Sequence, residues 1–286
     1  MAFKDLLLVL RSYPTPTSDE TIARCVDLAA AWRARLSAIS FGIVPKASAN
    51  PLRHVLIDIS ATVAAESNTS AADAQRMLAT FREAARQRSV PGVAILETCE
   101  LAAVSQMLVG HARLRDLTIL AVPADDYLSS YDLNLFAKTM VFDSGRPALV
   151  LPKASTDRDD LAFDTIVVAW DGGKPAVRAV ADALPLLRAA KMVRILTVAN
   201  KKTAAAVRSA PDLAEHLAVH GIEAVVDSVT SAGRTIDAVF AEYVTSHGAQ
   251  LIVMGGYGAP RLRKFIFGGA TQSLLMNPPT ALFLSH

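Results

Sequence analysis

Leu251-Ile-Val-Met254 runs directly into Gly255-Gly-Tyr-Gly258-Ala-Pro-Arg-Leu-Arg-Lys-Phe-Ile-Phe-Gly268-Gly-Ala-Thr271. Four consecutive apolar residues followed by glycines predict a buried strand that ends in a turn. Glycines at the carboxyl end of a strand let the backbone adopt positive φ and turn its amide groups toward an anion. The residues from Thr271 to the helix-breaking Asn277-Pro278-Pro279 predict a short helix, whose N-terminus favours phosphate. The stretch therefore predicts a strand, an anion-binding loop and a helix.

Strand and helix patterns alternate on both sides of this stretch. In the second half, short apolar runs predict strands over residues 165–170, 193–198, 222–229 and 250–254, and helical spacing predicts helices over residues 176–190 and 235–247. The first half opens in the same order, with predicted strands over residues 5–10 and 36–44 and, between them, a helix capped by Thr17 and Glu20. Residues 50–70 leave open an ordered excursion or a mobile loop. This alternation predicts an α/β fold, with helices covering a parallel sheet.

The chain contains the pattern twice. One constant offset, applied without a gap, lays Leu117–Ala121 on Gln250–Met254 and also lays Pro147–Leu151 on Thr280–Leu284. We therefore predict two tandem domains of ordinary size, residues 1–153 and 162–286, joined by the polar stretch Lys153 to Asp160.

The glycine spacing resembles the signature of the universal stress protein family. That signature is Gly, two residues, Gly, nine residues, then Gly followed by Ser or Thr, and here nine residues separate Gly258 from Gly268. The resemblance implies a tandem protein of two doubly wound, Rossmann-like domains of the adenine nucleotide α-hydrolase-like type. It also implies ATP, with Mg²⁺, as the ligand.

The family binds adenine and ribose near the ends of the first two strands of its domain. By resemblance, Ala169, Trp170, Asp171 and Val198 stand at those ends. Asp171 is equally well explained as a ribose ligand or as the first residue of an Asp-Gly-Gly turn. The other binding residues that the resemblance implies are Met254, Gly255, Gly258, Gly268, Gly269, Ala270 and Thr271.

Gly269 departs from the family pattern, because the family usually has Ser or Thr at this position. The missing hydroxyl donor predicts an affinity lower by about two- to twelve-fold, for a hydrogen bond worth about 0.5–1.5 kcal/mol. The departure weakens the predicted site without abolishing it.

The first domain lacks the glycines. The same offset places Val122, Asp125 and Leu135 opposite Gly255, Gly258 and Gly268. After the first predicted strand of each half, Ser12 stands where the second half has Asp171. Acidic residues repel a triphosphate. We predict that the first domain does not bind ATP; an alternative function is a pocket for something apolar, lined by residues such as Val122 and Leu135.

Composition excludes several classes of partner. The net charge is +2, from 29 basic and 27 acidic residues that are interspersed, so we predict no nucleic-acid and no membrane partner. The apolar runs are shorter than the roughly 20 residues of a spanning helix, and the N-terminal run is too short for a secretory signal. We therefore expect a cytoplasmic protein, with Cys25 and Cys99 as reduced core residues.

No catalytic or metal-binding constellation is evident in the sequence. The six histidines lack metal-ligand spacing, and the glycine stretch holds no evident general base. We therefore predict a nucleotide-binding protein in a stress-response or regulatory role, with hydrolysis slow or absent and at most weak ATPase activity. The alternatives are a scaffold or small apolar-ligand carrier and, with less support, an enzyme of the wider fold group.

The resemblance also implies how the two domains associate. In the family the last strand of each domain commonly forms the pairing interface. Ala148–Leu151 would then meet Ala281–Leu284 within one chain, as an internal pseudo-dimer, and a homodimer is allowed as a further assembly.

Overall fold

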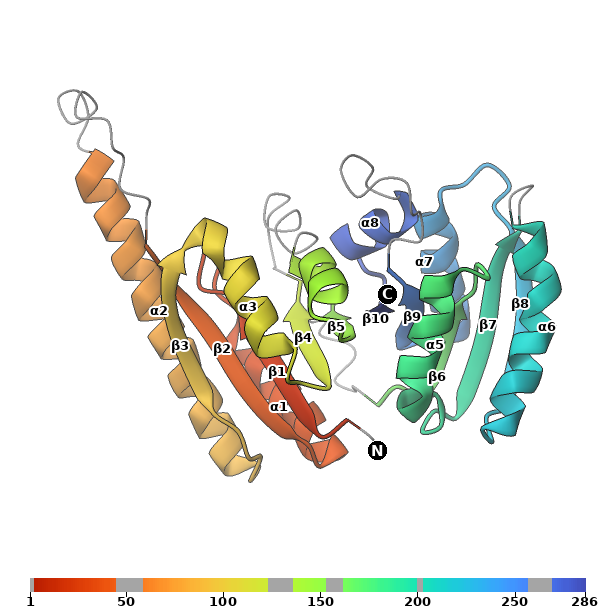
Figure 1. Cartoon of the computed structure of the whole chain (residues 1–286), viewed down its shortest axis with the longest axis horizontal. Helices are drawn as coiled ribbons and strands as arrows, with labels where there is room; N and C mark the ends of the chain where they lie inside the picture. Colours follow the sequence, from red (N-terminus) through yellow and green to blue (C-terminus); the bar gives the residue numbers. More distant parts are fainter. Residues whose placement is uncertain (1–2, 45–58, 123–135, 153–161, 200–202, 257–268) are drawn as a thin grey trace.

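The computed structural model describes residues 3–44, 59–122, 136–152, 162–199, 203–256 and 269–286. Within these ranges, ten strands form one sheet (Figure 1). The strands are β1 (Asp5–Leu10), β2 (Arg35–Val44), β3 (Ala94–Glu100), β4 (Leu117–Ala121), β5 (Ala148–Leu151), β6 (Thr165–Ala169), β7 (Met192–Ala199), β8 (Ala224–Thr230), β9 (Leu251–Gly255) and β10 (Ala281–Ser285). The helices are α1 (Asp19–Trp32), α2 (Ile59–Gln87), the short η2 (Leu101–Ala103), α3 (Val104–Ala112), residues 136–143, α5 (Lys174–Leu187), α6 (Ala204–Val219), α7 (Ile236–His247) and α8 (Gly269–Met276).

The two halves have the same strand order. The sheet runs β3-β2-β1-β4-β5-β10-β9-β6-β7-β8, so the second half repeats the order of the first in the opposite direction. All pairs within a half are parallel. The strand order reverses between β1 and β4 and again between β6 and β9, and such switch points are where open α/β sheets bind ligands. The predicted doubly wound α/β fold is confirmed.

Hydrophobic side chains cover both faces of the sheet. In β1, Leu6 and Leu8 join the core on the side of α1, α2, α5 and α6, whereas Leu7 joins the core on the side of α3, α7 and α8. Buried parallel strands need apolar residues on both faces, which explains the continuous Leu-Leu-Leu run.

The two halves share a central seam in which β5 and β10 run antiparallel. Leu149 lies opposite Phe283, so the predicted pairing of the closing strands within one chain is confirmed. An aromatic cluster packs beside this seam: the rings of Phe3 and Phe283 are 6.1 Å apart, those of Phe3 and Trp32 5.9 Å, and those of Trp32 and Phe163 6.3 Å. Residues from both halves therefore build one core at the seam. Residues 153–160, the predicted linker, lie outside the described residues.

The strand register corrects the predicted alignment of the halves. Leu6 and Ile166 are counterparts, because each stands two residues after the residue whose carbonyl accepts the N–H at the start of the neighbouring strand. Leu117 pairs with Leu6, and Leu251 pairs with Ile166, so Leu117 and Leu251 are counterparts too. The predicted alignment, which laid Leu117 on Gln250, was therefore wrong by one position. A one-residue slip moves every side chain to the other face, but strands that are apolar on both faces do not reveal the slip in their sequence.

The N-terminus of α1 also differs from its prediction. Ser18 is the capping residue, and its Oγ accepts a hydrogen bond from the backbone N–H of Thr21. Thr17 instead accepts a bond from the backbone N–H of Arg11 at 3.0 Å, which closes the turn after β1. The predicted Thr17–Glu20 capping box was therefore displaced by one residue.

Candidate functional site

The switch point of the second half brings together three of the residues that the sequence analysis selected. Ala169, at the end of β6, pairs directly with Met254 of β9. Val198 stands near the end of β7, on the other side of β6. The side chains of all three lie in the core on the side of α7 and α8. The predicted positions therefore share one edge and one face of the sheet.

The side chain of Trp170 lies on the opposite face of the sheet from Ala169. This side chain is buried, and the indole Nε1–H donates to Oγ of Ser209 on α6 at 2.9 Å. Only the main chain of Trp170 remains on the side of the candidate site. The apolar ring follows the alternation of β6, which places residue 170 in the same core as Val168.

Asp171 begins the turn between β6 and α5. Its exposed carboxylate accepts a hydrogen bond from the backbone N–H of Gly173 at 2.8 Å, and Gly173 is the N-cap residue of α5. This contact is the turn role that the sequence analysis weighed against ribose binding. The carboxylate faces solvent and keeps further acceptor capacity.

The carbonyl of Val198 already has a hydroxyl partner. Thr203 Oγ1 donates to this oxygen at 2.8 Å. A ligand that approaches the end of β7 therefore meets a carbonyl with one remaining lone pair.

Gly255 has a packing role that the sequence analysis missed. A Cβ at this position would lie 2.4 Å from the backbone nitrogen of Ala176 and 2.5 Å from the carbonyl carbon of Pro175. The first turn of α5 therefore excludes any side chain here. Proximity to α5 explains the glycine without a ligand, and it also brings the α5 N-terminus next to the end of β9.

The described ends of the glycine stretch both belong to this edge of the sheet. Gly256 follows β9 and donates its N–H to the carbonyl of Ser285 at 2.8 Å, and α8 begins at Gly269. The predicted short helix is confirmed, but it begins two residues earlier than predicted, so Gly269, Ala270 and Thr271 form its first turn. Gly258 and Gly268 lie outside the described residues.

The environment of Asp237, in the first turn of α7, includes α8. Hydrogen bonding to Thr235 first, and then to Ser273 of α8, lowers the pKa of Asp237, although partial burial acts against this shift. The sequence analysis did not identify Asp237 because the contact joins two helices that are distant along the chain. It helps to fix where the N-terminus of α8 lies.

The family model described as "Universal stress protein family" matches residues 162–284. Residues 162–284 form a universal stress protein domain. This match covers β6 through β9 and β10 up to Leu284, and therefore every residue that the sequence analysis selected for the candidate site.

Solved structures are similar over the whole chain, with both halves included. A universal stress protein from Archaeoglobus fulgidus DSM 4304 has a TM-score of 0.69 at 16% identity, over 98% of this chain and 95% of that one. A putative universal stress protein from Pseudomonas aeruginosa UCBPP-PA14 has a TM-score of 0.59 at 13% identity, over 99% of this chain and 93% of that one. At these identities the likeness concerns the fold. Comparison with curated protein sequences finds no match.

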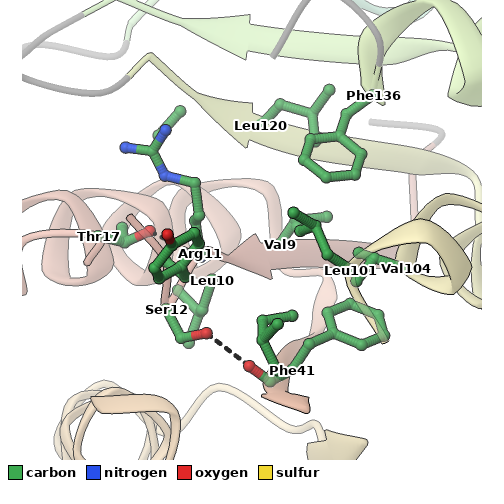
Figure 2. Close-up of a pocket in the computed structure, with 13 residues that line it drawn as sticks. Val9, Leu10, Arg11, Ser12, Thr17, Phe41, Leu101, Val104, Leu120 and Phe136 are labelled. Carbon is green, nitrogen blue, oxygen red and sulfur yellow. Dashed lines mark hydrogen bonds between the residues drawn. The ribbon is translucent and has the colours of Figure 1, made fainter. Parts of the chain in front are cut away.

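The first half has a pocket at the same place as the site of the universal stress protein domain. The space amounts to about 650 Å³, including the part open to solvent, and lies at the carboxyl ends of β1, β2 and β4 (Figure 2). The lining residues are Val9, Leu10, Arg11, Ser12, Tyr13, Thr17, Phe41, Ile43, Leu101, Val104, Leu120, Ala121 and Phe136.

The hydrogen bonds between strands show which residues of the two halves correspond. Arg35 and Met192 donate their N–H groups to Lys4 and Asp164, so Lys4 and Asp164 are counterparts. Counting along the strands from these anchors gives the remaining pairs: Val9 with Ala169, Arg11 with Asp171, Phe41 with Val198, Leu120 with Met254 and Ala121 with Gly255. These counterparts of the selected site residues all line the first-half pocket.

Two predictions for the first half are corrected by this correspondence. Arg11, not Ser12, stands opposite Asp171, so the charge at this position is reversed. Val122 is not a lining residue, because the pocket wall uses Leu120 and Ala121. Leu135 lies outside the described residues.

Within the described ranges, no group of three His, Cys, Asp or Glu residues is placed to hold a metal ion. No helix in the same ranges has both the length and the hydrophobicity needed to span a bilayer. Cys25 and Cys99 are both free thiols, and burial raises the pKa of Cys25 to about 12.

Proposed function

We propose that the universal stress protein domain binds an adenine nucleotide, ATP with Mg²⁺, at the switch point between β6 and β9. The observation that carries the proposal is the placement of the glycine stretch, which leaves the sheet after β9 and returns at the N-terminus of α8. Its spacing is that of the family signature. In a doubly wound sheet, ligands bind at this kind of position.

Helix α8 supplies a reason for phosphate binding. The first turn of a helix presents backbone N–H groups without intrahelical partners, and the helix dipole favours negative charge there. Gly269, Ala270 and Thr271 occupy this turn. Because Gly269 offers no hydroxyl, we expect an affinity about two- to twelve-fold below that of a site with Ser or Thr at this position.

The proposed role of the bound nucleotide is regulatory. ATP would change the conformation or the partners of the protein during a stress response, with hydrolysis slow or absent. We assign no catalytic residue, because the proposed contacts are backbone amides, which cannot act as a general base. We expect this function in the cytoplasm, with no nucleic-acid or membrane partner.

The first half is proposed not to bind ATP. Arg11 replaces Asp171, and in the corrected alignment Phe136 is the counterpart of Ala270, so an aromatic ring occupies a position that has a methyl group in the second half. This difference supports a single nucleotide site per chain.

Thermal unfolding of the nucleotide-stripped protein tests the ligand class. Mg-ATP at a hundred times its dissociation constant should add about 2.7 kcal/mol to the free energy of unfolding. Mg-GTP at the same concentration is the control for the base and should add less. Equal shifts with both nucleotides would argue for binding of phosphate alone, and the absence of a shift with either would remove the proposal.

The number of chains in the solution assembly is tested separately. The seam between β5 and β10 places the two halves of one chain in the arrangement of a pseudo-dimer. Light scattering after size exclusion distinguishes one chain from a homodimer in solution.

A further inference from the structure

The pocket of the first half is mainly apolar. Figure 2 shows side chains from several elements gathered around one space: Val9 of β1, Phe41 of β2, Leu101 of η2, Val104 of α3, Leu120 of β4 and Phe136 of the helix over residues 136–143. Phe41 and Val104 are almost fully buried, at 4% and 5% exposure. Leu101, at 50% exposure, stands where the pocket meets solvent. Walls of this kind fit an apolar ligand of small size.

The polar groups at the end of β2 are satisfied within the protein. Ser12 Oγ donates to the carbonyl oxygen of Phe41 at 2.5 Å and lies 2.9 Å from Ser70 Oγ. Ser70 Oγ accepts from the backbone N–H of Ile43 at 3.2 Å. Because buried hydroxyls contact the N–H of Ile43 as well as the carbonyl of Phe41, these groups add little polar affinity for a ligand, and the apolar walls are the main source of affinity.

Among the described residues that line the pocket, Arg11 is the charged one. The turn that follows β1 holds it in place: its Nε–H donates to the carbonyl of Thr15 at 3.0 Å, and the N–H of Thr17 donates to the Arg11 carbonyl at 2.9 Å. In Figure 2 the guanidinium lies on the side of the pocket away from Leu101 and Val104. One cation at the edge of an apolar space matches a ligand with one anionic end.

We propose that the first half binds a small monocarboxylic acid with an apolar chain, such as a medium-chain fatty acid. The chain lies among Val9, Phe41, Val104 and Leu120, and the carboxylate lies at Arg11. This inference does not depend on nucleotide binding by the second half, because the first-half pocket lies at the switch point between β1 and β4, whereas the proposed nucleotide site lies at the switch point between β6 and β9.

Calorimetric titration with octanoate tests the site, and octanol is the neutral probe of the same length. Arg11→Gln should weaken octanoate binding at least about tenfold, as expected for loss of a hydrogen bond to a charged group, and should leave octanol binding unchanged. Arg82→Gln, an exposed position on α2 outside the pocket lining, is the matched control and should change neither.

A second variant tests the apolar wall. Leu101→Asp places a carboxylate at a half-exposed position, which the fold should tolerate, and should weaken octanoate and octanol alike. Circular dichroism melts confirm that each variant is folded. The proposal is overturned if the wild type binds no octanoate, if both variants bind it as the wild type does, or if ATP displaces it competitively in Gly258→Asp, a variant with an impaired second-half loop.

Discussion

At Gly255 the end of β9 comes so close to the first turn of α5 that a side chain has no room. A Cβ would approach backbone atoms of Pro175 and Ala176 to 2.4–2.5 Å. We expect Gly255→Ala to lower the free energy of unfolding by about 1–3 kcal/mol, because the backbone must shift. Gly110→Ala is the matched control: a Cβ at Gly110 meets nothing within 4 Å, and alanine in a helix should stabilise α3 by about 0.5–1 kcal/mol.

Urea unfolding measures both changes. A Gly255→Ala protein as stable as the wild type would mean that α5 moves aside without cost. In that case the glycine at the end of β9 would be explained by ligand access alone.

Different substitutions separate the turn contact of Asp171 from its proposed contact with ATP. Its contact with the N–H of Gly173 needs only an acceptor oxygen, which asparagine also provides. Asp171→Asn should therefore keep the stability of the wild type. It should weaken the binding of ATP several-fold, because a charge-assisted hydrogen bond is lost. Asp171→Ala should lose the turn contact as well, at a cost of about 0.5–2 kcal/mol, comparable with the loss of a helix cap.

Calorimetric titration with Mg-ATP, together with urea unfolding, distinguishes these outcomes. Unchanged ATP affinity in Asp171→Asn would leave the turn as the only role of the residue.

The sequence predicted where the site residues lie better than it predicted what their side chains contact. Ala169, Val198 and Met254 meet at one edge because they end neighbouring parallel strands, which is a consequence of topology. Trp170 turns toward Ser209 because of strand alternation, and its partner lies on a helix whose position the sequence does not specify. Opposite Asp171, the one-residue difference replaces the neutral Ser12 that was predicted with the cation Arg11.

At the scale of elements, a polar network joins β7, β8 and α7. Arg194 Nη1 lies 2.7 Å from the carboxylate of Asp227 on the neighbouring strand, and Tyr243 of α7 donates its hydroxyl to the same carboxylate. Burial first, and then the bond to Asp227, raise the pKa of Tyr243 from 10.0 to about 12. The folded state therefore holds the phenol proton more tightly than the unfolded chain does.

The pH dependence of stability follows from this shift. Because the pKa of Tyr243 is higher in the folded state, its bound proton contributes to the free energy of unfolding. This contribution is complete below pH 10 and is lost as the pH rises toward 12. Wild-type stability should therefore decline over this interval more steeply than that of Tyr243→Phe, which has no phenol to ionise. Urea unfolding at several pH values tests this, and parallel curves for the two proteins would contradict it.

The helices show which element-level features the sequence could not reveal. Residues 50–70 left open an excursion or a loop, yet the structure has the 29-residue α2 beginning at Ile59. Its first part, Ile59 to Ser70, is rich in small and polar residues, so its helical pattern is weak, and packing on β2 and α1 compensates. Strands, with their dense apolar runs, were predicted more reliably than this helix.

At the scale of the whole molecule, the seam gives two similar halves one shared core. Phe283 of β10 is fully buried and packs on Phe3 of the first half. Phe283→Ala should therefore lower the free energy of unfolding by about 3–5 kcal/mol, through lost burial and a cavity. Val219→Ala, at a position 86% exposed on α6, should change it by less than about 0.5 kcal/mol.

Calorimetric unfolding shows whether the halves melt together. We expect one transition in the wild type, shifted to lower temperature as a single peak in Phe283→Ala. Two separate transitions in the wild type would contradict a core shared across the seam.

We propose that one half of the duplicated fold binds ATP. Titration calorimetry measures how many Mg-ATP molecules bind to each chain of the nucleotide-stripped protein and of two matched variants. Gly258→Asp places a carboxylate in the glycine stretch, and Ala124→Asp places one at the corresponding position of the first half. We predict one ATP per chain, lost in Gly258→Asp and unchanged in Ala124→Asp; two ATP per chain, none, or binding that survives Gly258→Asp would contradict the account.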